Sequence, residues 1–502
     1  MKLSYLLKEI LVPWDRIIMP DSEPGIDPEI TSIHAKAQDV KPGGLFIAIK
    51  GFVKDGHDYI DKALENKAAA VISEKFLGGE ENSAIVQVKN SRKAMASIAD
   101  LFYSNPTDKI TLIGITGTNG KTTTTWLLES ILNAAGHKVG VIGTINVRYN
   151  GKVYDTLVTT PESIDLQKIF SDMADSGVTH VIMEVSSHAI DLHRVDNCRF
   201  DIGIFTNLTQ DHLDYHKTMD AYWKCKQLFF TKILASKNPK GAPTAILNTD
   251  DKKGLKLADL LKGKRVNVLK VGLGKNSNLT CQKFTNDISG LRTTLLRDNS
   301  RIEIISSLTG GFNLENILCA AGAALSLGIS LGNIKKGVED CKNIPGRLER
   351  VNNNIERFIF VDYAHTPDAL ESILKTLEPL KPKQNSKLIT LFGCGGDRDP
   401  MKRKIMGQIA SNYSDVLIVT SDNPRSEDPG KIIKDILAGI DIKDTKKELV
   451  VEPDRKKALK AAVSLSSPGD IIIAAGKGHE TYQILKNGKI DFDDRNILKE
   501  AV

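Results

Sequence analysis

Residues 114–125 read GITGTNGKTTTT, an order of glycine, lysine and threonine that can bind phosphate. A short apolar run, 110–115, predicts a strand before this segment, and a helical pattern follows it. At such a turn, backbone N–H groups and the helix N-terminus attract phosphate. Lys121 can reach the β- and γ-phosphates, and the Thr122 hydroxyl can bind Mg²⁺. The strict G-x4-GK[ST] spacing is absent, since an isoleucine takes the place of the first glycine. A turn that only caps the helix is the alternative, and the preceding strand together with GKT favours the phosphate site.

Two further clusters follow predicted strands and carry groups that suit a divalent cation. Glu184 ends the predicted strand 178–184, where a carboxylate near the phosphate loop can hold Mg²⁺. The alternative is an acid that only caps the next turn. Residues 211–216 (DHLDYH) bring two aspartates and two histidines together after the predicted strand 201–206, which suits a cation or a phosphate. Taken alone, this stretch favours a solvated loop followed by a surface helix from Met219.

Polar loops also follow the predicted strands of the last third of the chain. They are 362–367 (DYAHTP), 393–403 (GCGGDRDPMKR), 422–429 (DNPRSEDP) and 476–480 (GKGHE). Because the carboxyl ends of parallel strands share one edge of a sheet, we expect these loops to line one cleft. The guanidinium groups of Arg398 and Arg425 have the fork geometry that suits carboxylate or phosphate. Upstream, Asn313 and Asn316 lie one helical turn apart in GGFNLEN, a pattern that is also typical of a simple helix cap.

The elements that must position these residues fall into three blocks. At ~150 residues per domain, the length of 502 residues predicts about three domains, in agreement with the three blocks. The first block has strands at 44–49 and 68–73 and a helix at 91–103, and Asn105-Pro106 breaks the chain after it. The other two blocks alternate apolar strands with helices, which predicts an α/β fold with a mainly parallel sheet in each. The predicted strands and final helix of the second block are 110–115, 139–142, 178–184, 201–206, 244–248, an antiparallel appendage over 279–305, and the helix 313–327. Those of the third block are 358–362, 387–392, 416–420 and 471–475. We place the domains at 1–107, 108–343 and 344–502.

Composition excludes several classes of protein. Charged residues are 26% and hydrophobic residues 41% of the chain, which excludes wholesale disorder and collagen-like fibres. A net charge of +6 over this length excludes a charge-dominated nucleic-acid tail and is only a weak indication of an anionic ligand. No apolar run approaches the ~20 residues of a membrane helix, and residues 1–14 predict an amphipathic helix instead of a signal peptide. The six cysteines are scattered without a CxxC pair, which indicates reduced thiols and a cytoplasmic protein.

Taken in order, these motifs resemble the Mur ligases, the ATP-dependent amide-bond enzymes of bacterial cell-wall assembly. The motifs are TGTNGKT, EVSSH, TNLTQDHLDYH, GGFNLEN, PGRLE, DYAHTP, GCGGDRD, DNPR and GKGHE, and they span nearly the whole chain. The match is closest to the members that add the third amino acid of the peptide. The resemblance implies an N-terminal α/β domain for a UDP-sugar, a central ATPase of P-loop type and a Rossmann-like C-terminal domain for an amino acid. It also implies a bacterial, cytoplasmic enzyme, which we expect to be a monomer without nucleic-acid or membrane partners.

The implied reaction transfers the γ-phosphate of ATP to the D-Glu side-chain carboxylate of UDP-MurNAc-L-Ala-D-Glu. An amine of meso-2,6-diaminopimelate then attacks the acyl phosphate, and Mg²⁺ supports the reaction. By resemblance, the catalytic residues are Lys121, Glu184, His212 and Lys226. The implied ATP-binding residues are Gly117, Thr118, Asn119, Gly120, Lys121, Thr122, Thr123, Asn313, Arg347 and Asp362. The implied metal ligands are Thr122, Glu184, His212 and Lys226, the last as a carbamate (N6-carboxylysine).

The resemblance also implies the remaining substrate contacts. Those to the UDP-substrate are Ser32, Thr159, Thr160, Ser186 and Arg194. Those to the amino acid are Arg398, Asp422, Asn423, Pro424, Arg425, Gly476 and Glu480. In DNPR, Arg425 would clamp the distal carboxylate that meso-diaminopimelate has and lysine lacks. The chain departs from the family pattern at Ile33 and Leu192, which concerns the UDP-sugar contacts.

Other functions stay open on the sequence alone. The same kind of ligase could add L-lysine, or the chain could be a folylpolyglutamate synthetase-like ligase. From another class, it could be a nucleotide-binding switch, which would bind ATP without amine-dependent turnover and would leave the charged loops of the third block unused.

Overall fold

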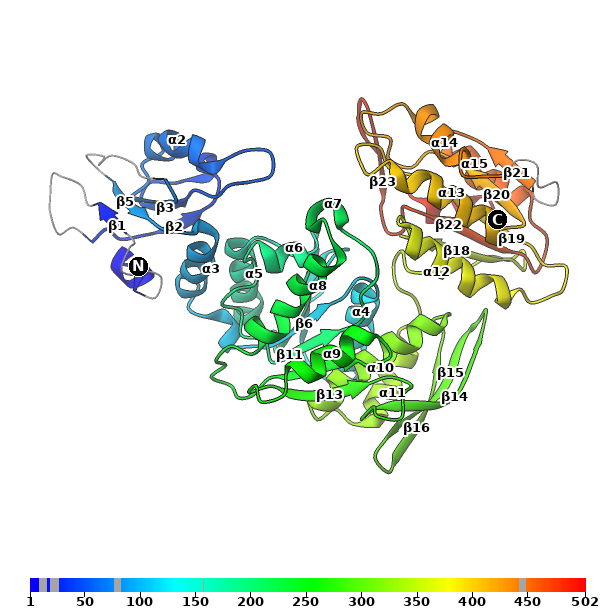
Figure 1. Cartoon of the computed structure of the whole chain (residues 1–502), viewed down its shortest axis with the longest axis horizontal. Coiled ribbons are helices and arrows are strands. Elements are labelled where there is room, and N and C mark those ends of the chain that lie inside the picture. The colour runs from blue at the N-terminus through cyan, green and yellow to red at the C-terminus, as the bar shows by residue number, and fades with distance from the viewer. Residues whose placement is uncertain (9–15, 19–26, 76–82, 157, 442–447) are drawn as a thin grey trace.

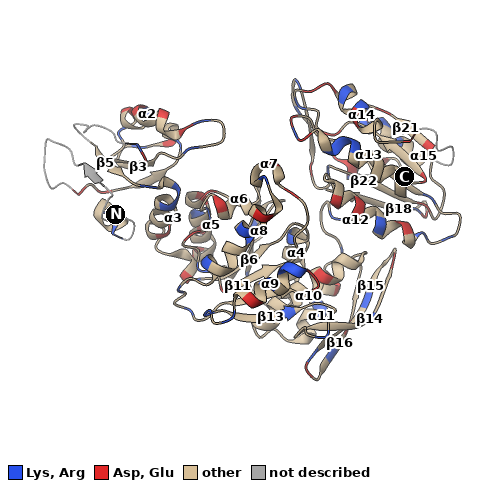
Figure 2. Cartoon of the chain, viewed as in Figure 1, with Lys and Arg blue, Asp and Glu red and all other residues tan. Residues whose placement is uncertain are grey.

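Three α/β units, each with its own sheet, make up the computed structural model of the chain (Figure 1). It describes residues 1–8, 16–18, 27–75, 83–156, 158–441 and 448–502. The central unit lies between the other two, and Lys, Arg, Asp and Glu are interspersed over all three (Figures 1 and 2). The predicted α/β class with a mainly parallel central sheet is confirmed. The predicted domain boundaries after residues 107 and 343 fall between the sheets. The exact boundaries stay predictions.

The N-terminal unit has a sheet in the order β1-β5-β4-β3-β2, in which only β1 runs antiparallel to its neighbour. Its strands and main helices are β1 (Arg16–Ile18), β2 (Ser32–His34), β3 (Gly44–Ile47), β4 (Ala70–Ser73), β5 (Ala84–Gln87), α1 (Leu3–Leu7), α2 (Ile60–Glu65) and α3 (Ser91–Phe102). The Asn90 side chain caps α3 by accepting a hydrogen bond from the Lys93 N–H. Of the helix predicted over 1–14, α1 is the described part, and residues 9–14 lie outside the described residues.

The central unit has an eight-stranded sheet in the order β13-β12-β11-β6-β10-β7-β8-β9. Its strands are β6 (Thr111–Thr116), β7 (Val139–Ile142), β8 (Val147–Tyr149), β9 (Lys152–Tyr154), β10 (His180–Glu184), β11 (Ile202–Phe205), β12 (Thr244–Asn248) and β13 (Asn267–Val271). Its helices are α4 (Lys121–Ala134), α5 (Ser163–Asp175), α6 (Ser187–Asp191), α7 (Leu213–His216), α8 (Met219–Leu228), α9 (Lys252–Leu260), α10 (Gly311–Ser326) and α11 (Leu331–Asp340).

Both faces of the central sheet are covered by helices. On one face, Ile113 and Ile115 of β6 pack in a core with α4, α10 and α11. On the other, Leu112 of the same strand packs in a core with α5, α6, α8 and α9. Because side chains alternate along a strand, a strand buried on both faces reads as a continuous apolar run. This double burial is why β6, β7, β10 and β12 are recognisable in the sequence.

A three-stranded antiparallel sheet extends from the central unit, as predicted for 279–305. Its strands are β14 (Thr280–Asp287), β15 (Gly290–Arg297) and β16 (Ser300–Ser306). Leu291, Leu295 and Ile304 join the core beneath α10 and α11, so one face of the appendage is anchored.

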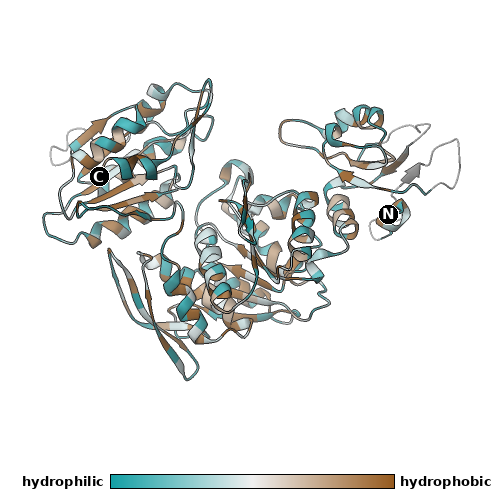
Figure 3. Cartoon of the chain, turned by 180° about the vertical axis from the view of Figure 1, so that it is seen from behind, coloured by the Kyte–Doolittle hydropathy of each residue, from teal (hydrophilic) through white to brown (hydrophobic). Residues whose placement is uncertain are grey.

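The C-terminal unit has a six-stranded sheet in the order β17-β18-β22-β19-β20-β21, with only β17 antiparallel. Its strands are β17 (Glu349–Val351), β18 (Phe358–Asp362), β19 (Leu388–Phe392), β20 (Val416–Val419), β21 (Glu448–Val451) and β22 (Ile471–Ala475), with a separate hairpin β23 (Tyr482–Leu485) and β24 (Gly488–Asp491). Its helices are α12 (Pro367–Leu377), α13 (Met401–Tyr413), α14 (Pro429–Leu437), α15 (Arg455–Ser464) and α16 (Asp494–Glu500). Apolar residues concentrate on the strands, and polar residues on the outer faces of the helices (Figure 3).

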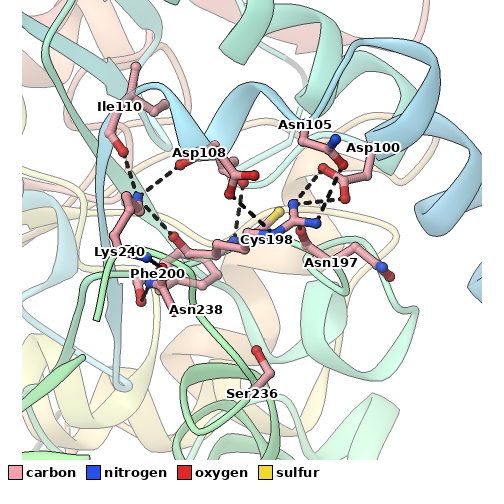
Figure 4. Close-up of polar contacts among 12 residues, drawn as sticks. Asp100, Asn105, Asp108, Ile110, Asn197, Cys198, Phe200, Ser236, Asn238 and Lys240 are labelled. Atoms are coloured by element: carbon pink, nitrogen blue, oxygen red, sulfur yellow. Dashed lines mark hydrogen bonds and ion pairs between the residues drawn. The ribbon is translucent and has the colours of Figure 1, made fainter. Parts of the chain in front are cut away.

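Ion pairs join the N-terminal unit to the central unit. The Arg199 guanidinium donates two hydrogen bonds to the buried Asp100 of α3 and also contacts Asp108 in the connection. The Lys240 ammonium lies 2.6 Å from Asp201 and donates to the carbonyls of Thr107 and Ile110. Asp100, Asp108 and Lys240 therefore belong to one polar cluster at the junction (Figure 4).

Two smaller sequence-based expectations can be checked directly. The six cysteines are free, as the absence of paired spacing indicated. Over the described ranges, no helix has the length and apolar character needed to cross a membrane.

Candidate active site

The phosphate-loop segment lies where β6 ends at Thr116 and α4 begins at Lys121, as the sequence predicted. Gly117 and Gly120 have φ values of 154° and 85°, which L side chains rarely adopt. A Cβ on Gly117 would collide with the Thr206 hydroxyl. Glycine is therefore required here by both backbone conformation and space.

The loop is held from a neighbouring strand end. Asn207 follows β11, and its backbone carbonyl and side-chain oxygen accept hydrogen bonds from the N–H groups of Thr118 and Asn119, both at 2.9 Å. The Thr206 hydroxyl donates to the Asn119 carbonyl at 2.6 Å. The sequence marks this TNLT segment as a motif, but its contact with the phosphate loop is not evident from the sequence.

Two lysines meet at the phosphate loop. The Lys121 ammonium donates to the carbonyls of Gly117 and Thr118, and the Lys226 ammonium donates to the same Gly117 carbonyl at 2.8 Å. Burial lowers the pKa of Lys121. Burial, reinforced by the charge of Lys121, lowers the pKa of Lys226 well below its usual range. Lys226 is only 1% exposed, so the expectation of a surface helix from Met219 is wrong for the face of α8 that carries it.

Glu184 lies beside the start of α4. Its Oε1 accepts hydrogen bonds from the Thr122 hydroxyl and the Thr144 N–H, both at 3.0 Å, and its Oε2 accepts one from the Thr144 hydroxyl at 2.9 Å. The carboxylate is buried and fully engaged, so it does more than cap the turn that follows β10. Thr144, which follows β7, was not among the residues predicted for the site.

His212 has a left-handed backbone with φ of 54° at the start of α7. Its ring lies against those of His188 and Tyr222, with centroids 5.0 and 5.9 Å away. Partial burial lowers its pKa to about 4, Asp211 opposes this shift, and the charges of Lys121 and Lys226 add to it. The imidazole is therefore neutral at pH 7 and can act as a metal ligand or hydrogen-bond partner.

The donor set fits a Mg²⁺ ion held mainly by substrate. Thr122 and Glu184 are in contact and supply hard oxygen atoms, which Mg²⁺ prefers. Among the residues that the structure describes, no three His, Cys, Asp or Glu side chains form a preformed metal cluster. This arrangement is typical of Mg²⁺ bound through one or two protein oxygens together with phosphates.

A residue of the C-terminal unit contacts the phosphate loop, and a second lies at the end of the first parallel strand of that unit. The Arg347 guanidinium donates to the Thr122 hydroxyl at 3.3 Å, which places it beside the phosphate loop. Asp362 ends β18, and its two carboxylate oxygens accept the N–H groups of Leu348 and Ala364. Burial raises the pKa of Asp362 to about 6, while Arg347 opposes the shift.

Asn313 is linked to the helix that follows the phosphate loop through Asn316. Its side-chain oxygen accepts a hydrogen bond from Asn316 at 3.1 Å, and Asn316 in turn accepts one from Thr124 at 3.4 Å. A Cβ on Gly120 would collide with Asn316, so Asn316 is the nearer of the two. Thr123 is buried in the first turn of α4.

Four of the five residues predicted for the UDP-substrate gather next to Glu184. The Thr160 hydroxyl donates to the Glu184 carbonyl and accepts the Ser186 N–H, and the Thr160 carbonyl accepts from Arg194. The Thr159 hydroxyl lies 3.1 Å from that of Thr144. Ser32 is separate, because its hydroxyl lies 2.8 Å from the Nε2 of His34, and within the described ranges no hydrogen bond joins it to the other four.

Glu162 is a further acidic group at this cluster that the sequence analysis missed. It forms ion pairs with Arg194, at 2.8 Å, and with Arg92 of the N-terminal helix α3, at 3.1 Å. The carboxylate therefore joins two units and offsets half of the charge of the two arginines.

The four loops of the C-terminal unit follow β18, β19, β20 and β22, which are parallel, so they share one edge as predicted. Asn423 donates to Glu480 at 2.9 Å, and Arg425 donates to the Gly396 carbonyl at 2.7 Å. A Cβ on Gly476 would lie 2.5 Å from Asp422 Oδ2. Pro424 is buried within this group, whereas Arg398 is exposed at its margin.

Three family models match the chain, and together they cover most of it. They are described as Mur ligase family, catalytic domain (residues 29–103), Mur ligase middle domain (115–324) and Mur ligase, glutamate ligase domain (346–478).

Curated relatives match over nearly the full length. A protein of Geobacter metallireducens named UDP-N-acetylmuramoyl-L-alanyl-D-glutamate--2,6-diaminopimelate ligase is 44% identical, with 97% of each chain covered. A protein of the same name from Geobacillus kaustophilus is 42% identical, with 95% of this chain and 96% of the relative covered.

Solved structures match as well. One titled as a UDP-N-acetylmuramoyl-L-alanyl-D-glutamate--2,6-diaminopimelate ligase has a TM-score of 0.69 and 30% identity, with 96% of each chain covered. A folylpolyglutamate synthase of Mycobacterium tuberculosis has a TM-score of 0.61 over 76% of this chain and 92% of its own, at 17% identity, which shows a shared fold alone.

Proposed function

Because the chain belongs to the Mur ligase family, we propose that it joins meso-2,6-diaminopimelate to the D-Glu side-chain carboxylate of UDP-MurNAc-L-Ala-D-Glu at the expense of ATP. The observation that carries this proposal is the identity of 42–44% with relatives of that name over at least 93% of the chain. The product would be a precursor of peptidoglycan. A monomeric state and a cytoplasmic location stay predictions.

The proposed chemistry places several anionic groups together, so the chain must supply positive charge and hydrogen-bond donors. The γ-phosphate moves to the substrate carboxylate, and the incoming amine then attacks the acyl phosphate and displaces phosphate. Lys121 and the N–H groups of residues 117–123 would bind the phosphates of ATP. Arg347, which contacts Thr122, would add a second cation from the C-terminal unit. Asn313 and Asp362 would contact the rest of the nucleotide.

Mg²⁺ ions would be held by Thr122, Glu184, His212 and a carbamate on Lys226, with the carbamate at a second ion, and they would neutralise phosphate charge when bound. The burial of Lys226 supports the carbamate. An ammonium that shares one carbonyl with Lys121 is repelled there, whereas a carbamate anion would be attracted by Lys121. The lowered pKa of Lys226 also favours the neutral amine that reacts with CO₂.

The two remaining substrates are assigned to separate groups of residues. Ser32, Thr159, Thr160, Ser186 and Arg194 would bind the UDP-substrate, and Ser32 would join the others only through the ligand. Arg398, Asp422, Asn423, Pro424, Arg425, Gly476 and Glu480 would bind the amino acid. Glu480 suits the distal ammonium of diaminopimelate, and Arg425 suits its distal carboxylate.

Product formation tests the proposal. With ATP, the UDP-dipeptide and meso-diaminopimelate, we expect phosphate release that requires all three and a product heavier by one diaminopimelate residue. Lys121→Met should reduce turnover by about a hundredfold or more, because it removes a cation at the transferred phosphate. Lys109→Met, at an exposed lysine just before β6, should leave turnover unchanged. Wild-type protein that binds ATP but releases no phosphate with any amino acid would contradict the proposal.

A further inference from the structure

Lys477 lies in the loop after β22 and is fully enclosed. Its side chain is 0% exposed. Gly476 and Gly478 flank it with φ values of 110° and 55°, and a Cβ on Gly478 would lie 2.6 Å from that of Tyr363. The loop is thus tightly fixed, and it carries a buried cation for which the proposed mechanism has no use.

The Lys477 ammonium contacts two residues assigned to the amino acid. It donates to Oδ1 of Asn423 at 3.2 Å and to Oε2 of Glu480 at 2.9 Å. These partners come from different strand ends, because Asn423 follows β20 and Glu480 follows β22. Lys477 therefore links the two loops that would receive the amino acid.

These contacts fix the orientation of the Asn423 amide. Its oxygen accepts from Lys477 and from the Ile484 N–H at 2.9 Å, while its Nδ2 donates to Oε2 of Glu480 at 2.9 Å. A flipped amide would set its N–H₂ group against two other donors. Among the described residues, Glu480 is the one acceptor for the Asn423 Nδ2 group, so its second N–H is left for a ligand.

The same contacts divide the Glu480 carboxylate into two unequal oxygens. Lys477 and Asn423 both donate to Oε2, and within the described ranges no hydrogen-bond donor reaches Oε1. The side chain is 14% exposed, so Oε1 is the oxygen available to a ligand cation. A buried carboxylate is costly unless a positive partner lies beside it, and Lys477 provides that partner.

We propose that Lys477 is a positioning residue of the amino-acid site, which holds the Asn423 amide and the Glu480 carboxylate in the one arrangement that accepts the distal end of the amino acid. In this arrangement, Oε1 of Glu480 faces an ammonium group, and the free amide N–H of Asn423 joins Arg425 at a carboxylate. The inference rests on the proposed function, because it assumes that these residues bind the incoming amino acid.

Steady-state kinetics of Lys477→Met test the inference. We expect the KM for meso-diaminopimelate to rise by about tenfold to a hundredfold, since hydrogen bonds to a charged group are lost. The KM values for ATP and the UDP-dipeptide should stay within about twofold. Lys486→Met, at an exposed lysine in the β23–β24 turn, is the matched control and should behave as wild type. An unchanged KM for diaminopimelate, or an equal rise for all three substrates, would overturn the inference.

A double-mutant cycle with Glu480→Gln covers the case in which Lys477→Met fails to fold. Glu480→Gln removes the buried negative charge, so the double variant should fold. In this background, Lys477→Met should change the KM for diaminopimelate by less than about threefold, because the charge that Lys477 balances is gone and the Asn423 oxygen keeps its hydrogen bond from the Ile484 N–H. A further tenfold rise in the double variant would overturn the inference. Failure of the proposed function is distinct, because wild-type protein would then show no diaminopimelate-dependent turnover at all.

Discussion

One added methyl group at Gly476 should disable the amino-acid site. Gly476 has φ of 110°, a conformation that costs an alanine on the order of 1–3 kcal/mol. The new Cβ would lie 2.5 Å from Oδ2 of Asp422, so this carboxylate must move. Its other oxygen accepts the Asn423 N–H at 2.5 Å, and losing a hydrogen bond to a charged group costs ~1.5–3 kcal/mol. At about 1.4 kcal/mol per tenfold, the KM for meso-diaminopimelate should rise roughly 10- to 150-fold.

Gly488→Ala is the matched control for this change. Gly488 has φ of 127°, so it meets similar backbone strain, but nothing lies within 4 Å of its added Cβ. Urea denaturation of both variants should show a loss of stability, whereas initial-rate phosphate release should show a raised KM for diaminopimelate in Gly476→Ala alone. A wild-type KM in Gly476→Ala, or equal rises in both variants, would refute the reasoning.

Two further predictions concern buried ionisable groups. Lys226→Met should abolish ligase activity, and added bicarbonate should not restore it. The pKa of Lys226 is lower in the folded protein than in the unfolded chain, so between these two pKa values the unfolded chain binds one proton more. The stability of the wild-type protein should therefore rise with pH over this range. Thermal melts in CO₂-free buffer should show this rise for the wild type and not for Lys226→Met. Retained activity would contradict the carbamate. For Asp362, burial raises the pKa to about 6, so the KM for ATP should increase as pH falls through 6 and the carboxylate loses an acceptor. Asp362→Asn should lack this acid limb, and an identical limb in the variant would contradict the assignment.

Continuous apolar runs explain which strands could be predicted from the sequence. Strands β6, β12, β18 and β22 are buried on both faces, and the sequence marks each of them. The hairpins β8–β9 and β23–β24 were not predicted, because β9 and β24 are exposed along their length and lack any apolar pattern. Their pairing depends on register with a neighbouring strand, which local composition does not encode.

The part of the candidate site that lies at the ends of strands could be predicted from the sequence. The loop at Gly117 and the strand-end acid Glu184 follow from the rule that functional groups sit at the carboxyl ends of parallel strands. The burial of Lys226 was not predictable from its helix, because a carbonyl more than a hundred residues earlier covers it. Lys477 was missed for the same reason, since its partner Asn423 lies 54 residues away in the chain.

The choice of amino acid tests the central claim most directly. Phosphate release by the wild-type protein should be measured with ATP, the UDP-dipeptide and either meso-diaminopimelate or L-lysine at equal concentrations. We expect kcat/KM to favour diaminopimelate by about a hundredfold, because lysine leaves the Arg425 guanidinium without its carboxylate. Arg425→Ala should narrow this ratio by lowering the diaminopimelate rate alone. Faster phosphate release with lysine than with diaminopimelate would contradict the account.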